Sequence, residues 1–119
     1  MDANKVFSLN FAKIYQLYLQ KVEKKGRTAE ELDTVILWLT GYDEKGLREQ
    51  LEQDADLKTF IDHAPQMNPN CSAIRGKVCG VRVEDIEDPM MRKIRYLDKL
   101  VDELAKGRPM KRILRNDDK

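Results

Sequence analysis

Long hydrophobic runs are absent from this sequence of 119 residues. No apolar stretch approaches the roughly 20 residues that a helix needs to cross a membrane. The first residues also lack the apolar segment of a secretory signal peptide. We therefore expect a soluble, cytoplasmic protein that does not contact a membrane.

Cysteine and histidine are scarce, with two cysteines and one histidine. In the cytoplasm Cys71 and Cys79 would normally be thiols, with a disulfide between them as the alternative. A zinc site built from these two cysteines and His63 would need a fourth ligand, Asp62 or Glu84. The short CxxC and HxxxH pairs that mark such sites are missing, so we expect neither a metal nor another cofactor.

Net charge is also nearly absent, at +1, so the total charge does not by itself indicate nucleic acid. The charges are nevertheless unevenly distributed. Residues 29–58 contain nine acidic and three basic side chains, whereas residues 89–119 contain ten basic and five acidic ones. This asymmetry allows acidic and basic parts to lie side by side, within one chain or between chains.

The composition is typical of a small globular protein, with 41% hydrophobic and 36% charged residues. Neither an internal repeat nor a linker-like stretch interrupts the chain. We expect one helical domain over residues 1–119, with an ordered core from about residue 8 to residue 115.

The clearest structural signal is the segment Asp88–Gly107. Asp88 is a favourable N-cap, and Pro89 suits the first helical position because the N–H that it lacks would be unpaired there. Lys106 and Gly107 are typical of a helix end. Apolar residues recur between them with helical spacing: Met90, Ile94, Leu97, Leu100, Val101 and Leu104. The segment predicts a long helix with one face in the core.

Five other segments have helical features. They are residues 10–25, 28–40, 43–53, 56–64 and a terminal helix from Pro109. In the first of these we expect Leu17 to broaden the buried face, and in the second Thr28 and Glu31 form a capping-box pattern. The predicted fold is mainly α: a compact bundle of about five to six helices around Asp88–Gly107.

Residues 65–83 are the least regular part of the chain. Two prolines and two asparagines in residues 65–71 predict a turn-rich loop. Ile74 and Val78 favour a short helix from Ser72, whereas Val81 and Val83 alternate as in a strand. We expect a short helix and a loop, with room for one short extended segment near residues 76–83.

Three long phrases resemble one bacterial family. They are KKGRTAEELDTVILWLTGY (Lys24–Tyr42), APQMNPN (Ala64–Asn70) and CGVRVEDIEDPMMRKIRYLDKLVDELAKG (Cys79–Gly107). Together they resemble the family known as domain of unknown function 2200, from about Phe11 to Leu114. The resemblance implies a compact, mainly helical cytoplasmic protein, and it supplies no catalytic or binding residue.

The loop after residue 64 and one nearby arginine are candidates for a ligand or partner site. The candidate residues are Gln66, Met67, Asn68 and Arg82. Irregular backbone held between rigid helices is where binding residues tend to lie. The structural alternative is that Asn68 and Asn70 only close turns with their side-chain amides.

The basic C-terminal segment is a candidate for contact with nucleic acid, because phosphate recognition needs clustered cations. Its candidate residues are Arg108, Lys111, Arg112 and Arg115. Acidic residues interrupt the basic residues that precede this segment, and Glu103 is placed to pair with Lys99. A solvated helix face explains these charges at least as well.

A weaker alternative is an enzyme that uses Cys79 as a nucleophile. Cys79 lies between Lys77 and Arg82, and nearby cations favour the thiolate. Catalysis would also require a base, and His63 is the one histidine of the chain. The alternative is a packed thiol beside a turn glycine, and we assign no catalytic residue.

We therefore expect a non-enzymatic helical module that binds a protein partner, another copy of itself included. Methionine side chains suit adaptable contact surfaces, and the sequence places four in suitable segments: Met67, Met90, Met91 and Met110. Nucleic-acid binding through the basic C-terminal segment is the first alternative to this function.

Overall fold

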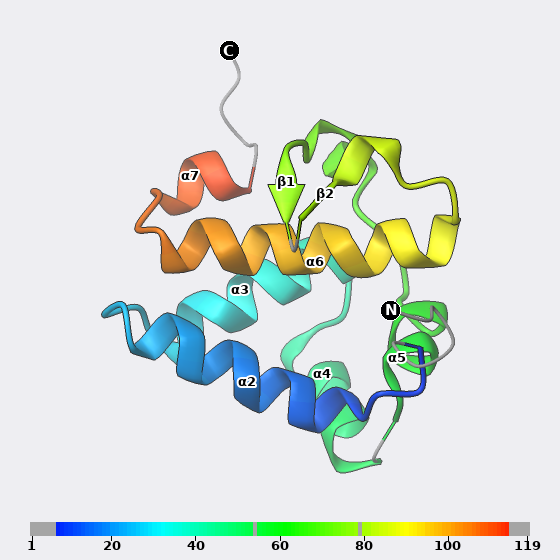
Figure 1. The fold of residues 1–119 in the computed structure, drawn as a ribbon. Helices are drawn as coiled ribbons and strands as arrows, with labels where there is room; N and C mark the ends of the chain where they lie inside the picture. The colour runs from blue at the N-terminus through cyan, green and yellow to red at the C-terminus, as the bar shows by residue number, and fades with distance from the viewer. Residues whose placement is uncertain (1–6, 54, 79, 115–119) are drawn as a thin grey trace.

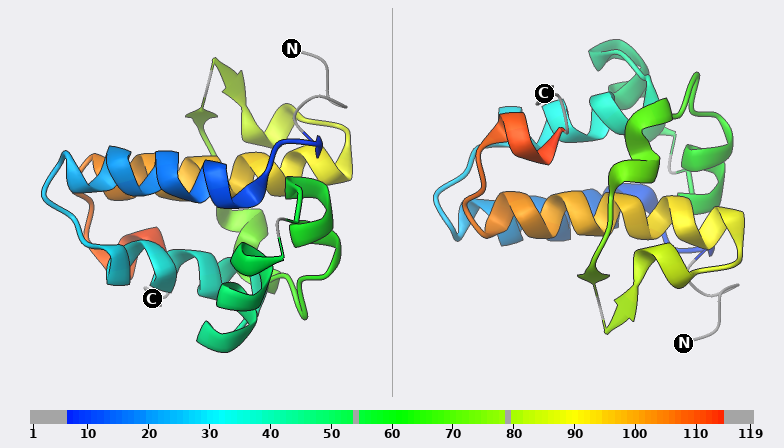
Figure 2. Two further views of the ribbon diagram at one scale, coloured as in Figure 1. Left: turned by 90° about the horizontal axis from the view of Figure 1, so that it is seen from below. Right: turned by 90° about the horizontal axis from the view of Figure 1, so that it is seen from above.

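Three long helices pack against one another at the centre of the structure: α2 (Phe11–Glu23), α3 (Ala29–Thr40) and α6 (Pro89–Ala105) (Figure 1). The structure is a computed structural model, which describes residues 7–53, 55–78 and 80–114. Over these ranges it has six α-helices and one small antiparallel hairpin, which confirms the mainly α prediction. Figure 2 shows α4 (Glu44–Glu52) and α5 (Leu57–Asp62) together near one end of the three-helix core.

Helix α6 begins and ends where its sequence predicts. The Asp88 side chain accepts hydrogen bonds from the backbone N–H groups of Met90 and Met91, with Pro89 at the first helical position. At the other end Gly107 has a φ of +86°, and the N–H of Arg108 donates to the carbonyl of Glu103. This is the hydrogen bond of a Schellman motif.

The predicted apolar face of α6 lies in the core. Ile94, Leu97, Leu100, Val101 and Leu104 are all buried, and Met90 is partly buried against them. Burial of this face against both α2 and α3 makes α6 the central element of the fold.

Helix α2 confirms the predicted spacing with one exception. Asn10 caps it, and Phe11, Tyr15, Tyr18 and Val22 are buried. The prediction that Leu17 broadens this face is wrong, since Leu17 is 59% exposed. At about 100° per residue, Leu17 lies roughly 120° from the direction of the four buried side chains.

Helix α3 has the predicted capping box. Thr28 accepts from the N–H of Glu31, and the Glu31 carboxylate accepts from the N–H of Thr28. Arg27 also donates to Glu31, with a distance of 2.9 Å from Nη2 to Oε2. These bonds make the Glu31 carboxylate a stabilising group at the start of α3.

We expect Glu31→Gln to lower the Tm of the protein at neutral pH and to lower it much less in acid. The hydrogen bonds from Arg27 and Thr28 hold the pKa of Glu31 below its ordinary value of 4.5. The stabilisation is therefore complete above that ordinary value and is lost as the pH falls through the lower folded-state pKa. Thermal unfolding of the wild type and the variant across this range tests this. A difference in Tm that is independent of pH would contradict it.

Residues 65–83 resolve into short elements. A 3-10 helix, η1, spans Pro69–Ala73. The prediction of a helix from Ser72 that carries Ile74 and Val78 is wrong, because η1 ends before Ile74 and Val78 lies in a strand. Strands β1 (Lys77–Val78) and β2 (Val81–Arg82) form the hairpin, followed by a second 3-10 helix, η2 (Val83–Asp85). The extended segment is thus a pair of strands, and β1 packs on α6.

The chain ends with a short helix, α7 (Met110–Ile113), at the end of α6 that is remote from α5 (Figure 1). Ile113 is fully buried, and Met110 and Leu114 are partly buried against the core, as predicted. None of the helices in the described ranges is both long and apolar enough to cross a membrane.

Candidate functional site

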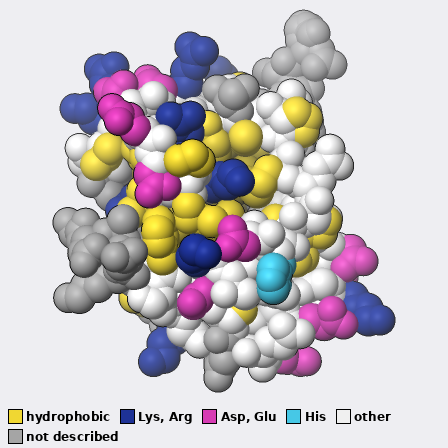
Figure 3. Space-filling view, turned by 90° about the vertical axis from the view of Figure 1, so that its right-hand side faces the viewer, with side chains coloured by type: hydrophobic (Ala, Val, Ile, Leu, Met, Phe, Trp, Pro, Cys, Tyr) yellow, Lys and Arg dark blue, Asp and Glu magenta, His cyan; other side chains and the backbone are white. Residues whose placement is uncertain are grey.

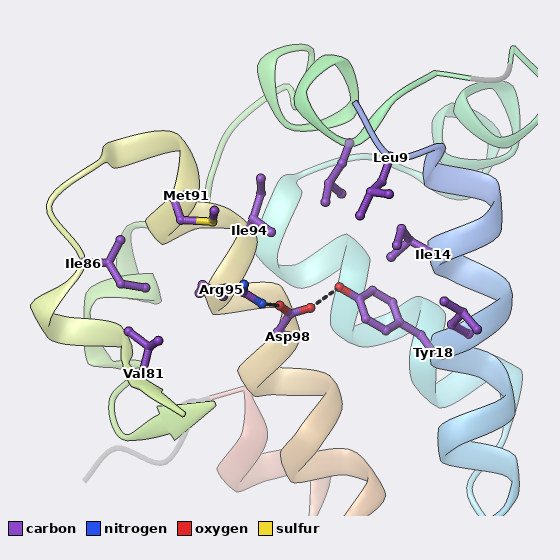
Figure 4. Close-up of a pocket in the computed structure, with 11 residues that line it drawn as sticks. Leu9, Ile14, Tyr18, Val81, Ile86, Met91, Ile94, Arg95 and Asp98 are labelled. Atoms are coloured by element: carbon purple, nitrogen blue, oxygen red, sulfur yellow. Dashed lines mark hydrogen bonds and ion pairs between the residues drawn. The ribbon is translucent and has the colours of Figure 1, made fainter. Parts of the chain in front are cut away.

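A pocket of about 580 Å³ opens between α2, α6 and the hairpin (Figure 4). Its walls come from three stretches of the chain that are distant in sequence: residues 9–18, Leu57 and residues 81–98. The lining residues are Leu9, Ile14, Leu17, Tyr18, Leu57, Val81, Ile86, Met91, Ile94, Arg95 and Asp98. Most are aliphatic, and we refer to this site as the apolar pocket.

The exposed hydrophobic side chains of the protein gather at this pocket. Among the described residues, three large hydrophobic side chains are exposed: Leu9 at 42%, Leu17 at 59% and Val81 at 44%. All three line the apolar pocket. Figure 3 shows hydrophobic side chains gathered on one face, with charged side chains among and around them. Such a patch on a small protein usually marks an interaction site.

Three polar residues connect the helices at the base of the pocket (Figure 4). The hydroxyl of Tyr18 on α2 donates to Oδ1 of Asp98 on α6, at 2.5 Å. Arg95 Nη1 donates to Oδ2 of the same carboxylate, at 2.7 Å. Hydrogen bonds to an ionised carboxylate are short and strong, so Asp98 holds α2 and α6 at a fixed separation.

Backbone contacts fix the remaining walls. The N–H of Leu57 donates to the carbonyl of Leu9, which joins the start of α5 to the segment before α2. Opposite, the Arg92 guanidinium donates from Nε and Nη2 to the carbonyl of Ile86, the first at 2.7 Å. These bonds fix the positions of Leu9 and Ile86 at the pocket.

We expect Tyr18→Phe to lower the free energy of unfolding by about 1–2 kcal/mol, because it removes a hydrogen bond to a charged acceptor. Tyr15→Phe is the matched control, since the Tyr15 hydroxyl donates to Asp33 Oδ1 at 2.6 Å away from the pocket. Urea unfolding of both variants should show losses of similar size. No loss in the Tyr18 variant would mean that this bond does not hold the two helices together.

The candidate loop residues Gln66 and Asn68 form hydrogen bonds with the C-terminal end of α3. Asn68 donates from Nδ2 to the carbonyl of Trp38, and its backbone N–H donates to Leu39. The N–H of Gln66 donates to the carbonyl of Thr40. Carbonyls at a helix end have no partner within the helix, so this loop closes α3. Met67 is partly buried against the core.

Arg82 and the basic C-terminal candidates lie elsewhere. Arg82 is exposed on β2, next to Val81, but does not line the apolar pocket. Arg108, Lys111 and Arg112 are exposed around α7, at the far end of α6. Arg115 lies outside the described residues. The described candidates thus lie in three separate places: the loop at the end of α3, strand β2 and the surface around α7.

The candidate cysteine site is only partly described. Cys79 lies outside the described residues, so its candidacy as a nucleophile has no structural test. Cys71 is a half-buried free thiol, and burial raises its pKa, which disfavours the reactive thiolate. His63 is exposed at the end of α5. The described ranges contain no cluster of three or more acidic, histidine or cysteine side chains that could hold a metal.

Sequence reasoning missed the apolar pocket. Leu9 and Val81 lie outside the helical stripes, and the sequence pattern places Leu17 in the core although it is exposed. One signal was present, since Leu17 departs from the stripe formed by the other apolar residues of α2. The pairing of Tyr18 with Asp98, 80 residues later, has no local signal in the sequence.

Comparisons with known proteins agree with this fold. The family model described as "Uncharacterized protein conserved in bacteria (DUF2200)" matches residues 5–115. The crystal structure of the uncharacterized protein SP1917 is similar, with a TM-score of 0.92 and 42% sequence identity, over 99% of this chain and 98% of that one. No curated protein matches. Since the family model covers nearly the whole sequence, and a solved structure shares both fold and sequence, this chain belongs to the bacterial DUF2200 family.

Proposed function

We propose that this protein is a non-enzymatic protein-interaction module whose docking surface is the apolar pocket. The observation that supports it most is the position of Leu9, Leu17 and Val81. These large hydrophobic side chains, exposed in the described structure, all line one pocket. Covering them removes apolar surface from water, which drives most protein association.

The exposed side chains at the edge of the pocket favour a protein as its binding partner over a small molecule. Small ligands bind in concave sites that enclose most of their surface. A molecule seated within the pocket would leave much of Leu17 in water, since that side chain is 59% exposed at the rim. A protein surface covers the pocket and its rim together, and an apolar centre inside a polar rim is the usual pattern of such interfaces.

The polar groups of the pocket support a binding role more than a catalytic one. Both carboxylate oxygens of Asp98 already accept hydrogen bonds, from Tyr18 and from Arg95. An acid or base that acts on a substrate must be able to reach the proton that it transfers. Asp98 instead connects the two helices that form the walls.

Site-specific photocrosslinking in bacterial cells tests the proposal. A photoreactive amino acid at Leu17 should give a covalent protein adduct, and the same group at Glu49, exposed on α4, should give none. Val81→Asp, on the opposite wall, should abolish the Leu17 adduct while the protein stays folded. No adduct from Leu17, or equal adducts from both positions, would refute the proposal.

Nucleic-acid binding is the second candidate, and the exposure of Arg108, Lys111 and Arg112 favours it. If phosphates bind these side chains, affinity for an oligonucleotide should fall steeply with salt. Arg112→Glu should then weaken binding further. Fluorescence anisotropy with labelled DNA and RNA measures this, and absence of binding at low salt would remove this candidate.

A further inference from the structure

We infer that the occupant of the apolar pocket is a second copy of this chain, bound about a two-fold axis that runs along α6. The inference rests on the proposed function, because it identifies the partner for the same pocket. It depends on how charges and apolar side chains are divided between the two walls.

The two walls have opposite charge. On one wall, Leu17 of α2 has exposed Lys13 and Lys21 one turn before and one turn after it. Lys21 is only loosely paired, at 3.5 Å from Asp102, with 48% of its side chain exposed. The other wall contains Val81 and is continued by residues 84–88, which read EDIED and have four exposed acidic side chains. Arg82, next to Val81, is also exposed, but successive side chains of a strand point to opposite faces, so Arg82 points away from the face that Val81 presents. The wall that contains Val81 is therefore mainly acidic beside the pocket, whereas the wall that contains Leu17 is basic.

This division is self-complementary under one orientation of the axis. In a two-fold dimer, each contact of one wall with the other occurs twice. An axis along α6 places the α2 wall of each copy against the acidic wall of its partner. An axis across α6 would instead place Lys13 against its own copy, which is unfavourable because like charges repel. Opposite charges therefore select the first arrangement.

The apolar side chains are also divided in a way that suits this arrangement. Leu17 of each copy would meet the wall that contains Val81 and Ile86 of the other, twice in the dimer. A dimer interface of standard size covers about 800 Å² on each partner. The whole surface of the chain is 6984 Å², so a dimer of this size would cover roughly a tenth of it.

Sedimentation velocity over a range of concentrations tests the inference on the purified chain. The wild type should form dimers, and Leu17→Asp should be a monomer. Gln16→Asp is the matched control, with the same charge change on the same helix but roughly 150° from the pocket side. It should dimerise as the wild type does. Circular dichroism should show that both variants remain folded, since both positions are exposed.

Two charge reversals test the orientation. Lys13→Glu and Glu87→Lys should each weaken the dimer about tenfold, since each places like charges together twice. Mixing these two variants should restore dimers to about the wild-type affinity. In the mixed dimer, one of the two contacts joins the two reversed side chains and the other joins wild-type Lys13 with wild-type Glu87, so both contacts again pair opposite charges. This recovery is not expected for an interface elsewhere on the molecule.

A wild type that stays monomeric at all concentrations would overturn the inference, as would a dimer that Leu17→Asp leaves intact. Single reversals without effect would overturn the proposed axis. If the chain is monomeric but the Leu17 crosslinker captures a different protein in a Val81-dependent way, the docking surface stands and only the identity of its occupant is wrong. If neither occurs, both proposals fail.

Discussion

Phe60→Ala should lower the free energy of unfolding by about 3–5 kcal/mol, a large part of the 5–15 kcal/mol typical of a folded domain. Phe60 is fully buried, and its ring stacks on Phe11 with 3.7 Å between the ring centroids. Tyr42 packs against the same ring, with centroids 4.9 Å apart. Truncation would leave a cavity between α2 and α5.

Urea unfolding compares this variant with two controls. Phe60→Leu keeps most of the volume and should cost clearly less. Leu17→Ala removes an exposed aliphatic side chain and should cost little, although it removes part of the docking surface. If Phe60→Ala is no more destabilising than Leu17→Ala, the stacked cluster is not part of the stabilising core.

Gly41→Ala should be the other severe substitution, at about 2–4 kcal/mol. Gly41 ends α3 with a φ of +80°, a conformation that costs other residues about 1–2 kcal/mol. A Cβ there would lie 2.6 Å from the carbonyl oxygen of Gln66 and 2.9 Å from its nitrogen. Both are backbone atoms, and the N–H of Gln66 is bonded to Thr40, so the loop cannot move away without losing that bond.

Gly26→Ala is the matched control for this clash. Gly26 has a φ of +83°, but a Cβ there would meet no atom within 4 Å. Its cost should be about 1–2 kcal/mol, from the backbone conformation alone. Equal losses for the two variants would show that the contact with Gln66 does not restrict this position.

Helix positions were predictable because the signals that define them are local. Asp88 lies within one turn of the N–H groups that it caps, Pro89 occupies the adjacent first helical position, and the stripe of α6 is visible from spacing alone. The same is true of Thr28 and Glu31, three residues apart. Local hydrogen bonds and periodic burial leave a readable pattern in the sequence.

The loop after residue 64 shows where this reasoning stops. Its prolines and asparagines predict turns, and Asn68 does accept from the N–H of Asn70. Its second role, donation to the carbonyl of Trp38, joins residues 30 apart. Nothing in either segment predicts this bond, since it depends on how α3 and the loop come together.

The hairpin is a second example. Gly76 and Gly80 weaken both the helical and the extended prediction for this segment. In the structure both glycines have positive φ. Gly76 comes directly before β1, Gly80 comes directly before β2, and the two strands pair through Lys77 with Arg82 and Val78 with Val81. Lys99 of α6 donates to the carbonyl of Lys77 on β1. Strands this short depend on such support, because an isolated hairpin is at best marginally stable.

The sequence alone determined the helical class, most helix boundaries and the buried face of α6, because caps and apolar spacing act over a few residues. Only the tertiary structure decided that Leu9, Leu17 and Val81 line one pocket, and that Tyr18 reaches Asp98. Three stretches distant in sequence form that pocket, and their relative positions follow from packing of the whole core. The surface that we propose binds a partner is therefore a property of the fold and not of any one motif.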